Sequence, residues 1–155
     1  LLGWMWKIQS SDGSWTPLWF GDQDAKDERS PVYGTAMAVE YLSTSRNPLA
    51  RKLAENGLRY LLDSQNEDGG WGGAPKVASK ITLTARALSA LASYPESDLK
   101  SMERGFDYLY GMYQSGLLFR PEPIGLYFAR LWYSEELYNH TFVLNALKKL
   151  KQRIK

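Results

Sequence analysis

The chain of 155 residues contains no cysteine and a single histidine. The lack of cysteine excludes disulfide bonds, thiolate zinc sites and cysteine nucleophiles together. One histidine, His140, is too few for most histidine-based metal sites. We therefore expect no metal centre of these kinds and interpret His140 as a structural residue.

Neither the charge nor the hydropathy of the chain points to nucleic acid or to a membrane span. The 19 Lys and Arg against 17 Asp and Glu leave a net charge of +2, which is too small for a broad field that favours nucleic acid. No run of eighteen apolar residues occurs, and the first residues lack the pattern of a secretion signal. We expect no nucleic-acid partner and place the protein in the cytoplasm or on a membrane surface facing it.

Aromatic residues are abundant instead. They make up 14% of the chain, with 6 Trp and 10 Tyr, within an apolar content of 44%. This composition predicts one domain with a substantial core, and more rings than a helical core of this size normally needs. The chain also starts at Leu1, inside what reads as the end of a helix, so we expect it to be part of a longer protein.

A six-residue step from glutamine to tryptophan occurs twice, and the two copies start 56 residues apart. Such self-similarity predicts a repeat architecture. The glutamine amide can satisfy backbone groups at helix ends, glycine permits the chain to reverse, and tryptophan covers the turn. We interpret these residues as structural fasteners between helical hairpins and not as ligand contacts: Gln9, Gly13, Trp15, Gln65, Gly69 and Trp71.

The remaining pattern predicts helices and no strand. Ser30-Pro31 and Asn47-Pro48 are typical helix starts, and Ser97 can cap a later helix. Apolar residues then recur at steps of three and four. Helices are expected over about 2–9, 30–43, 47–64, 79–94 or 82–94, 97–113, 124–133 and 135–154. The result is an all-α chain of about three helical hairpins.

These features together resemble the C-terminal part of squalene-hopene cyclases and related triterpene cyclases. The resemblance rests on the two glutamine-to-tryptophan copies, a Thr-Ala-x-Ala pattern at 35–38 and 84–87, Tyr33-Gly34-Thr35, and the segment 138–142. It implies that residues 1–155 form a single domain, the C-terminal half of an α/α toroid or α/α barrel. In such cyclases a polyene is protonated and folds into fused rings inside an aromatic-lined cavity, without a metal or organic cofactor. The implied substrate of the parent protein is squalene or a similar isoprenoid.

The catalytic acid of this family, an Asp-x-Asp-Asp motif, is absent from the chain. Asp22-Gln23-Asp24-Ala25 comes closest, but it lacks the final aspartate and falls in the polar stretch 21–29. We interpret this stretch as a solvated loop inserted relative to the family. It is not a calcium loop, because Asp27 stands where that loop requires glycine. The chain is therefore expected to supply cavity wall and no catalytic residue, and to be inactive by itself.

The resemblance also implies which residues line the substrate cavity. Tyr127 and Tyr138 fall on aromatic positions of the family, and Tyr133 and Phe128 lie nearby, with core packing as the alternative for these two. Ring faces suit this chemistry, because each contact stabilises a cation by about 0.5–2 kcal/mol. Glu135 stands at a family tyrosine position, so either it points outward or the chemistry differs.

Other interpretations remain open. The chain could be a non-catalytic α/α scaffold that binds an isoprenoid or a protein partner. Zinc-dependent protein prenyltransferases share the toroid, but this chain resembles them less, because they need a cysteine ligand and it has no cysteine. A half toroid exposes a concave apolar face, so we expect self-association or a large open groove.

The basic residues near the end are expected to form a solvated helix terminus, with contact to anionic lipid as the alternative: Lys148, Lys149, Lys151 and Arg153.

Overall fold

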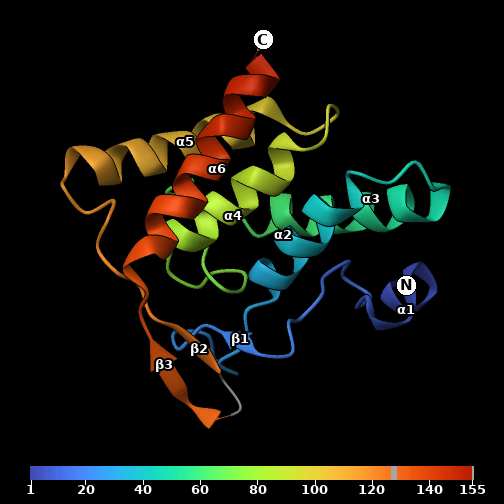
Figure 1. The fold of residues 1–155 in the computed structure, drawn as a ribbon, viewed down its shortest axis with the longest axis horizontal. Coiled ribbons are helices and arrows are strands. Elements are labelled where there is room, and N and C mark those ends of the chain that lie inside the picture. Colours follow the sequence, from blue (N-terminus) through green and yellow to red (C-terminus); the bar gives the residue numbers. More distant parts are fainter. Residues whose placement is uncertain (127–128, 155) are drawn as a thin grey trace.

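A computed structural model of the protein describes residues 1–126 and 129–154. The helices are α1 (Leu2–Ile8), α2 (Pro31–Leu42), α3 (Pro48–Asp63), α4 (Ile81–Ala92), α5 (Leu99–Gln114) and α6 (Glu136–Ile154) (Figure 1). The strands are β1 (Phe20–Gly21), β2 (Ile124–Leu126) and β3 (Leu131–Tyr133). The predicted, mainly helical architecture is confirmed, with a small sheet as an addition.

The helices are arranged in two layers. Helix α4 packs against both α2 and α6, while α3 packs on α2 and α5 packs on α4. One layer therefore consists of α2, α4 and α6, which run in the same direction with their N-terminal ends toward the sheet (Figure 1). We call this the inner layer, and α3 and α5 form the outer layer. This alternation between layers is the α/α arrangement that the repeats predict.

Local signals explain the starts of α2, α3 and α5. The Asn47 side chain accepts a hydrogen bond from Leu49 N at 2.9 Å, as expected for a residue that caps a helix. Two predicted caps are wrong. Asp98, not Ser97, caps α5 by accepting from Ser101 N at 2.9 Å. The Ser30 side chain makes no capping bond, and α2 begins at a proline, whose fixed φ already suits the first helical turn.

The helix expected over 124–133 is wrong, because β2 and β3 form an antiparallel hairpin there. Ile124 pairs with Tyr133, and Phe20 of β1 adds a further edge by pairing with Leu126. Branched and aromatic residues suit strands. A side chain at Gly125 would collide with the carbonyl oxygen of Leu131, so only glycine permits this pairing. Tyr127 and Phe128 lie outside the described residues.

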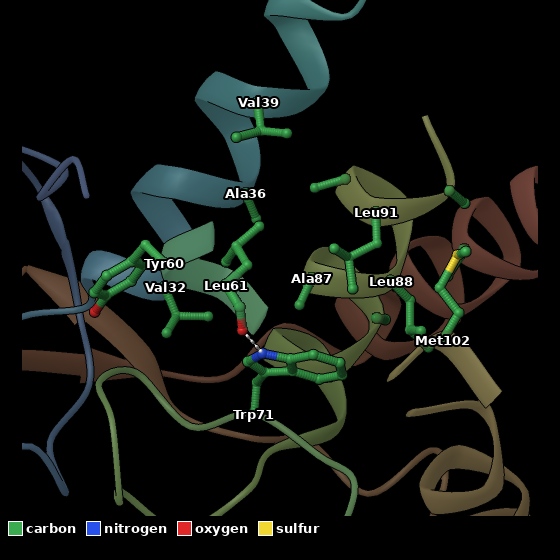
Figure 2. Packing of buried hydrophobic residues seen from close by; sticks show 14 of the residues in the cluster. Val32, Ala36, Val39, Tyr60, Leu61, Trp71, Ala87, Leu88, Leu91 and Met102 are labelled. Atoms are coloured by element: carbon green, nitrogen blue, oxygen red, sulfur yellow. Dashed lines mark hydrogen bonds between the residues drawn. The ribbon is translucent and has the colours of Figure 1, made fainter. Parts of the chain in front are cut away.

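The core lies between the two helical layers, around two tryptophans. Trp71 is fully buried, and its Nε1 donates a hydrogen bond to Leu61 O at 2.7 Å (Figure 2). Figure 2 also shows side chains of α2 and α4 pointing into the same core, among them Val39 and Leu88. Burying a tryptophan side chain of 150–250 Å² stabilises the fold by about 4–6 kcal/mol. This explains why tryptophan stands at the centre of the repeat.

Candidate functional site

The two glutamines of the repeated segments make equivalent hydrogen bonds. Gln9 Nε2 donates to Gly13 O and to Leu53 O, both at 3.0 Å. Gln65 Nε2 donates to Gly69 O at 2.8 Å and to Ser101 O at 2.9 Å. Leu53 lies in α3 and Ser101 in α5. Each glutamine therefore joins its own turn to a helix of the outer layer.

The two tryptophans are held in the same equivalent way. Trp15 N donates to Thr35 Oγ1 at 2.9 Å, and Trp71 N donates to Thr84 Oγ1 at 3.0 Å. These threonines open the Thr-Ala-x-Ala pattern of α2 and α4. The Trp15 indole donates to Met5 O at 3.0 Å. With 4% and 0% of their surfaces exposed, the two rings present no face to a ligand.

The glycines of the segments allow the turns to press against the outer helices. Gly13 and Gly69 have φ values of +91° and +87°, in the left-handed region that favours glycine. A side chain at either position would also collide with a backbone carbonyl oxygen, of Asn56 in α3 or of Arg104 in α5. Both repeated segments thus face the outer layer, so any ligand contact has to be sought elsewhere.

The opposite side of the inner layer carries a different set of residues, which we call the inner face. Its members recur at steps of three and four, so in each helix they lie on one side. They are turned away from residues such as Val39 and Leu88, which pack toward the outer helices. The inner face comprises Tyr33, Met37 and Glu40 of α2, Arg86, Ser89 and Ser93 of α4, and Tyr138, Phe142, Asn145 and Lys149 of α6.

Near the sheet, the inner face is aromatic. Tyr138 stacks on Phe142 with ring centroids 5.3 Å apart, and Phe20 of β1 lies 5.3 Å from Tyr33. Tyr133 of β3 packs against the same cluster. Burial, together with a hydrogen bond to Tyr133, raises the pKa of the Tyr138 hydroxyl above its ordinary value. The structure thus brings two of the four predicted cavity residues together.

Farther along the same helices, the inner face is polar. Glu40 Oε1 accepts hydrogen bonds from Lys149 Nζ at 2.6 Å and from Asn145 Nδ2 at 3.3 Å. Lys149 also donates to Ser93 Oγ at 2.8 Å. Lys149 is therefore not part of a solvated terminus, as the sequence predicted, but links α6 to α2 and α4. The sequence analysis also missed Glu40, because its partner lies 109 residues away.

Arg86 lies between the aromatic and the polar parts. Its guanidinium carbon is 3.7 Å from the centroid of the Phe142 ring and 5.7 Å from that of Tyr33. The distance from its nearest nitrogen to Glu40 Oε2 is 4.0 Å, too long for a hydrogen bond. Arg86 Nε is buried and has no hydrogen-bond partner among residues 1–126 and 129–154. A fixed cation therefore occupies ring faces that could otherwise stabilise a carbocation.

Residues 1–152 match the family model of the squalene-hopene cyclase C-terminal domain. The chain belongs to this family. The match covers the repeated segments, the inner face and the hairpin. The family resemblance inferred from the sequence is thereby confirmed.

The chain is similar in sequence to several larger proteins. An ent-copalyl diphosphate synthase from Streptomyces sp. (strain KO-3988) is 24% identical over 144 residues, which are 93% of this chain and 25% of that protein. A squalene–hopene cyclase from Zymomonas mobilis is 28% identical over 114 residues, 66% of this chain and 16% of that protein. The chain thus spans a quarter or less of the length of these relatives.

The fold of the chain is similar to that of a solved structure. The type II terpene cyclase MstE from Scytonema matches with a TM-score of 0.60 and 15% identity, over 71% of this chain and 32% of that chain. At this identity the likeness concerns the fold alone. It agrees with the α/α arrangement of the two helical layers.

The stretch 21–29 is mostly exposed, as the sequence predicted for a solvated loop, but it contains a buried aspartate. Asp22 is 1% exposed and accepts hydrogen bonds from Lys80 Nζ and, at 2.9 Å, from Gly73 N. Lys80 also lies 2.8 Å from Asp24. The sequence did not reveal this pairing, because the partners lie more than fifty residues away. Asp22 is held as a hydrogen-bond acceptor by Lys80 and Gly73, neither of which belongs to the inner face, so the pair gives no support to an acid at Asp22.

The structure also shows where two other residues from the sequence analysis lie, Glu135 and His140. Glu135 is exposed, and the direction in which its side chain points stays a prediction. The His140 ring stacks on Phe119 with centroids 4.1 Å apart, and its Nδ1 lies 3.0 Å from Glu136 O. Within the described ranges, no group of three or more His, Cys, Asp or Glu side chains could hold a metal ion.

Open apolar hollows lie between α5 and α6, with volumes of about 640 and 370 Å³. The larger is lined by residues such as Met102 and Leu150, and Phe106 lines both. An apolar groove was expected on the concave side, whereas these hollows lie between an inner and an outer helix. Self-association through an apolar face stays a prediction.

Proposed function

We propose that this chain is a wall segment of a protein that cyclises an isoprenoid by protonation of a polyene. The observation that carries the proposal is the aromatic part of the inner face, where Tyr33 of α2 and Tyr138 of α6 belong to one cluster with Tyr133 of β3. Ring faces stabilise a carbocation without offering a lone pair that would trap it. The named relatives, a squalene–hopene cyclase and a copalyl diphosphate synthase, support the same chemistry.

In this proposal the acid comes from outside the chain. Glu40 is the one carboxylate among the inner-face residues that the structure describes. It accepts hydrogen bonds from Lys149 and Asn145, so it is arranged as an acceptor and not as a proton donor. Tyr133 and Tyr138 are proposed to line the cavity, and Tyr127 and Phe128 stay predictions from the family resemblance. The six residues of the repeated segments are proposed to fasten the hairpins together.

Contact with a membrane surface is a further part of the proposal. Among the described residues, no helix is long and apolar enough to span a bilayer. Trp4 and Trp6 of α1 are 59% and 61% exposed, and tryptophan suits a membrane interface. A substrate as apolar as squalene would be drawn from such a surface.

The test uses the full-length protein that contains this chain. Incubation with squalene, and separately with a C20 prenyl diphosphate, is expected to give a cyclic product from one of them. Tyr138→Leu, which removes a ring but keeps an apolar side chain, should lower the rate, whereas Phe106→Leu in the apolar hollows between α5 and α6 should not. A folded protein that binds either isoprenoid without forming a cyclic product would reject the enzyme and favour the scaffold.

A further inference from the structure

We propose that Arg86, supported by Lys149, binds the phosphate-bearing head group of an isoprenoid on the inner face. The inference rests on the proposed function, because it names the substrate class of that same site. It makes the substrate an isoprenyl phosphate or diphosphate and not a plain hydrocarbon.

The first argument for this inference is the net charge of the inner face. Arg86 and Lys149 contribute two positive charges against the single negative charge of Glu40, so the network is net positive. The three side chains are only 16%, 22% and 23% exposed. Partly buried charges lose hydration that must be replaced by other polar contacts. A hydrocarbon substrate offers none, whereas a phosphate group offers several oxygen acceptors.

The second argument is that Arg86 has hydrogen-bond donors that the fold does not use. Stacking on Phe142 engages the flat face of the guanidinium and leaves its edge, where the N–H groups lie, available. Its Nε finds no acceptor within the part of the chain that the structure describes, and Glu40 stays 4.0 Å away. The planar edge of an arginine fits two oxygens of a phosphate at once. Arg86 is therefore held in place with unused donors.

Lys149 has a supporting part. It donates to Glu40 and Ser93, which leaves one of its three N–H donors without a partner in the part of the chain that the structure describes. It lies near the C-terminal ends of α2 and α4, where helix dipoles favour a cation. The dipoles oppose an anion at that end, so the head group is expected beside Arg86, in the middle of α4, with Lys149 adding charge from one side.

The order of side chains along the inner face matches such a ligand. The aromatic cluster at Tyr33 and Tyr138 lies next to the sheet, Arg86 follows, and Lys149 comes last. Phe142 and Lys149 are two turns apart on α6, a rise of about 10 Å. An apolar chain lying on the rings would thus place an anionic head group at Arg86, while the Arg86 charge would repel a carbocation from the Phe142 ring.

Isothermal titration of the full-length protein tests the inference without turnover. A C20 prenyl diphosphate is expected to bind more tightly than the C20 prenyl alcohol, and inorganic pyrophosphate is expected to compete with it. Arg86→Met should weaken diphosphate binding roughly tenfold to hundredfold, since it removes charge-assisted hydrogen bonds. Binding of the alcohol should stay unchanged, which a merely structural role of Arg86 would not produce.

Matched variants keep the result interpretable. Arg86→Lys retains the charge but not the planar donors and should give intermediate binding. Lys149→Met should weaken diphosphate binding, whereas Lys148→Met, at the exposed neighbouring position, should not. Equal affinity for the diphosphate and the alcohol, or equal effects of Lys148→Met and Lys149→Met, would overturn the inference. Cyclisation of squalene by a protein that ignores diphosphate would reject this inference alone, and diphosphate binding without any cyclic product would reject the proposed function alone.

Discussion

Lys80 at the start of α4 donates a hydrogen bond to the buried carboxylate of Asp22, 58 residues earlier in the chain. The same carboxylate accepts from Gly73 N in the second repeated turn at 2.9 Å. Asp22 follows directly after β1, whose partner strand belongs to the hairpin near the end of the chain. This pair therefore connects the loop, the repeat and the sheet.

Asp22→Asn should lower the free energy of unfolding by about 3 kcal/mol. This is the lower end of the range for breaking a buried pair, because Asp24 remains 2.8 Å from Lys80. Urea unfolding followed by circular dichroism measures the change. Asp27→Asn is the control, since that carboxylate is 62% exposed and should change stability by at most about 1 kcal/mol. Equal effects of the two variants would show that the buried pair contributes no more to the free energy of unfolding than an exposed carboxylate does.

The same pair predicts a dependence on alkaline pH. Burial alone lowers the pKa of Lys80, but hydrogen bonds and charge attraction from Asp22 and Asp24 outweigh it and raise the pKa above 10.5. The stabilisation is therefore complete below pH 10.5 and is lost as the pH rises through the raised pKa. Between pH 10 and 12 the free energy of unfolding should fall more steeply in the unmodified protein than in Lys80→Met. Burial also raises the pKa of Tyr60 and Tyr94 to about 12, but both proteins share that contribution, and parallel curves would contradict the prediction.

Two glycines of α5 should respond oppositely to alanine. A Cβ at Gly105 would lie 2.8 Å from atoms of both Trp71 and Leu88, whereas a Cβ at Gly111 meets nothing within 4 Å. Gly105→Ala should cost about 1–2 kcal/mol, because crowding of the core exceeds the gain in helix propensity. Gly111→Ala should stabilise by up to about 1 kcal/mol. Thermal unfolding separates the two, and a stabilising Gly105→Ala would show that Trp71 can move aside.

Gln65 tests the fastening role of the repeated segment. Gln65→Ala removes hydrogen bonds to Gly69 O and Ser101 O and should lower the free energy of unfolding by about 2 kcal/mol. Gln65→Glu should cost at least as much, since a carboxylate offers no donor to the two carbonyls. Gln23→Ala, at an exposed position, should have little effect. If Gln65→Ala were as mild as Gln23→Ala, the fastening role would be wrong.

The helices and the two repeated turns could be predicted from the sequence because their signals are local. Asn47 caps α3 through a residue two positions away, and Gln65 bonds Gly69 four positions away. Tryptophan and glycine at fixed spacing likewise identified the turns before their contacts were known. Even so, the cap of α5 was misplaced by one residue, because Ser97 and Asp98 are both suitable caps.

Only the tertiary structure decided the hairpin and the polar part of the inner face. The hairpin gains its third strand from Phe20, which pairs with Leu126, 106 residues later in the chain. Glu40 meets Lys149 over a separation of 109 residues, and Asp22 meets Lys80 over 58. In the sequence each of these charges looks like an ordinary surface residue. Their partners are set by which helices and turns pack together, and that depends on burial of the whole core and not on the residues nearby in the chain.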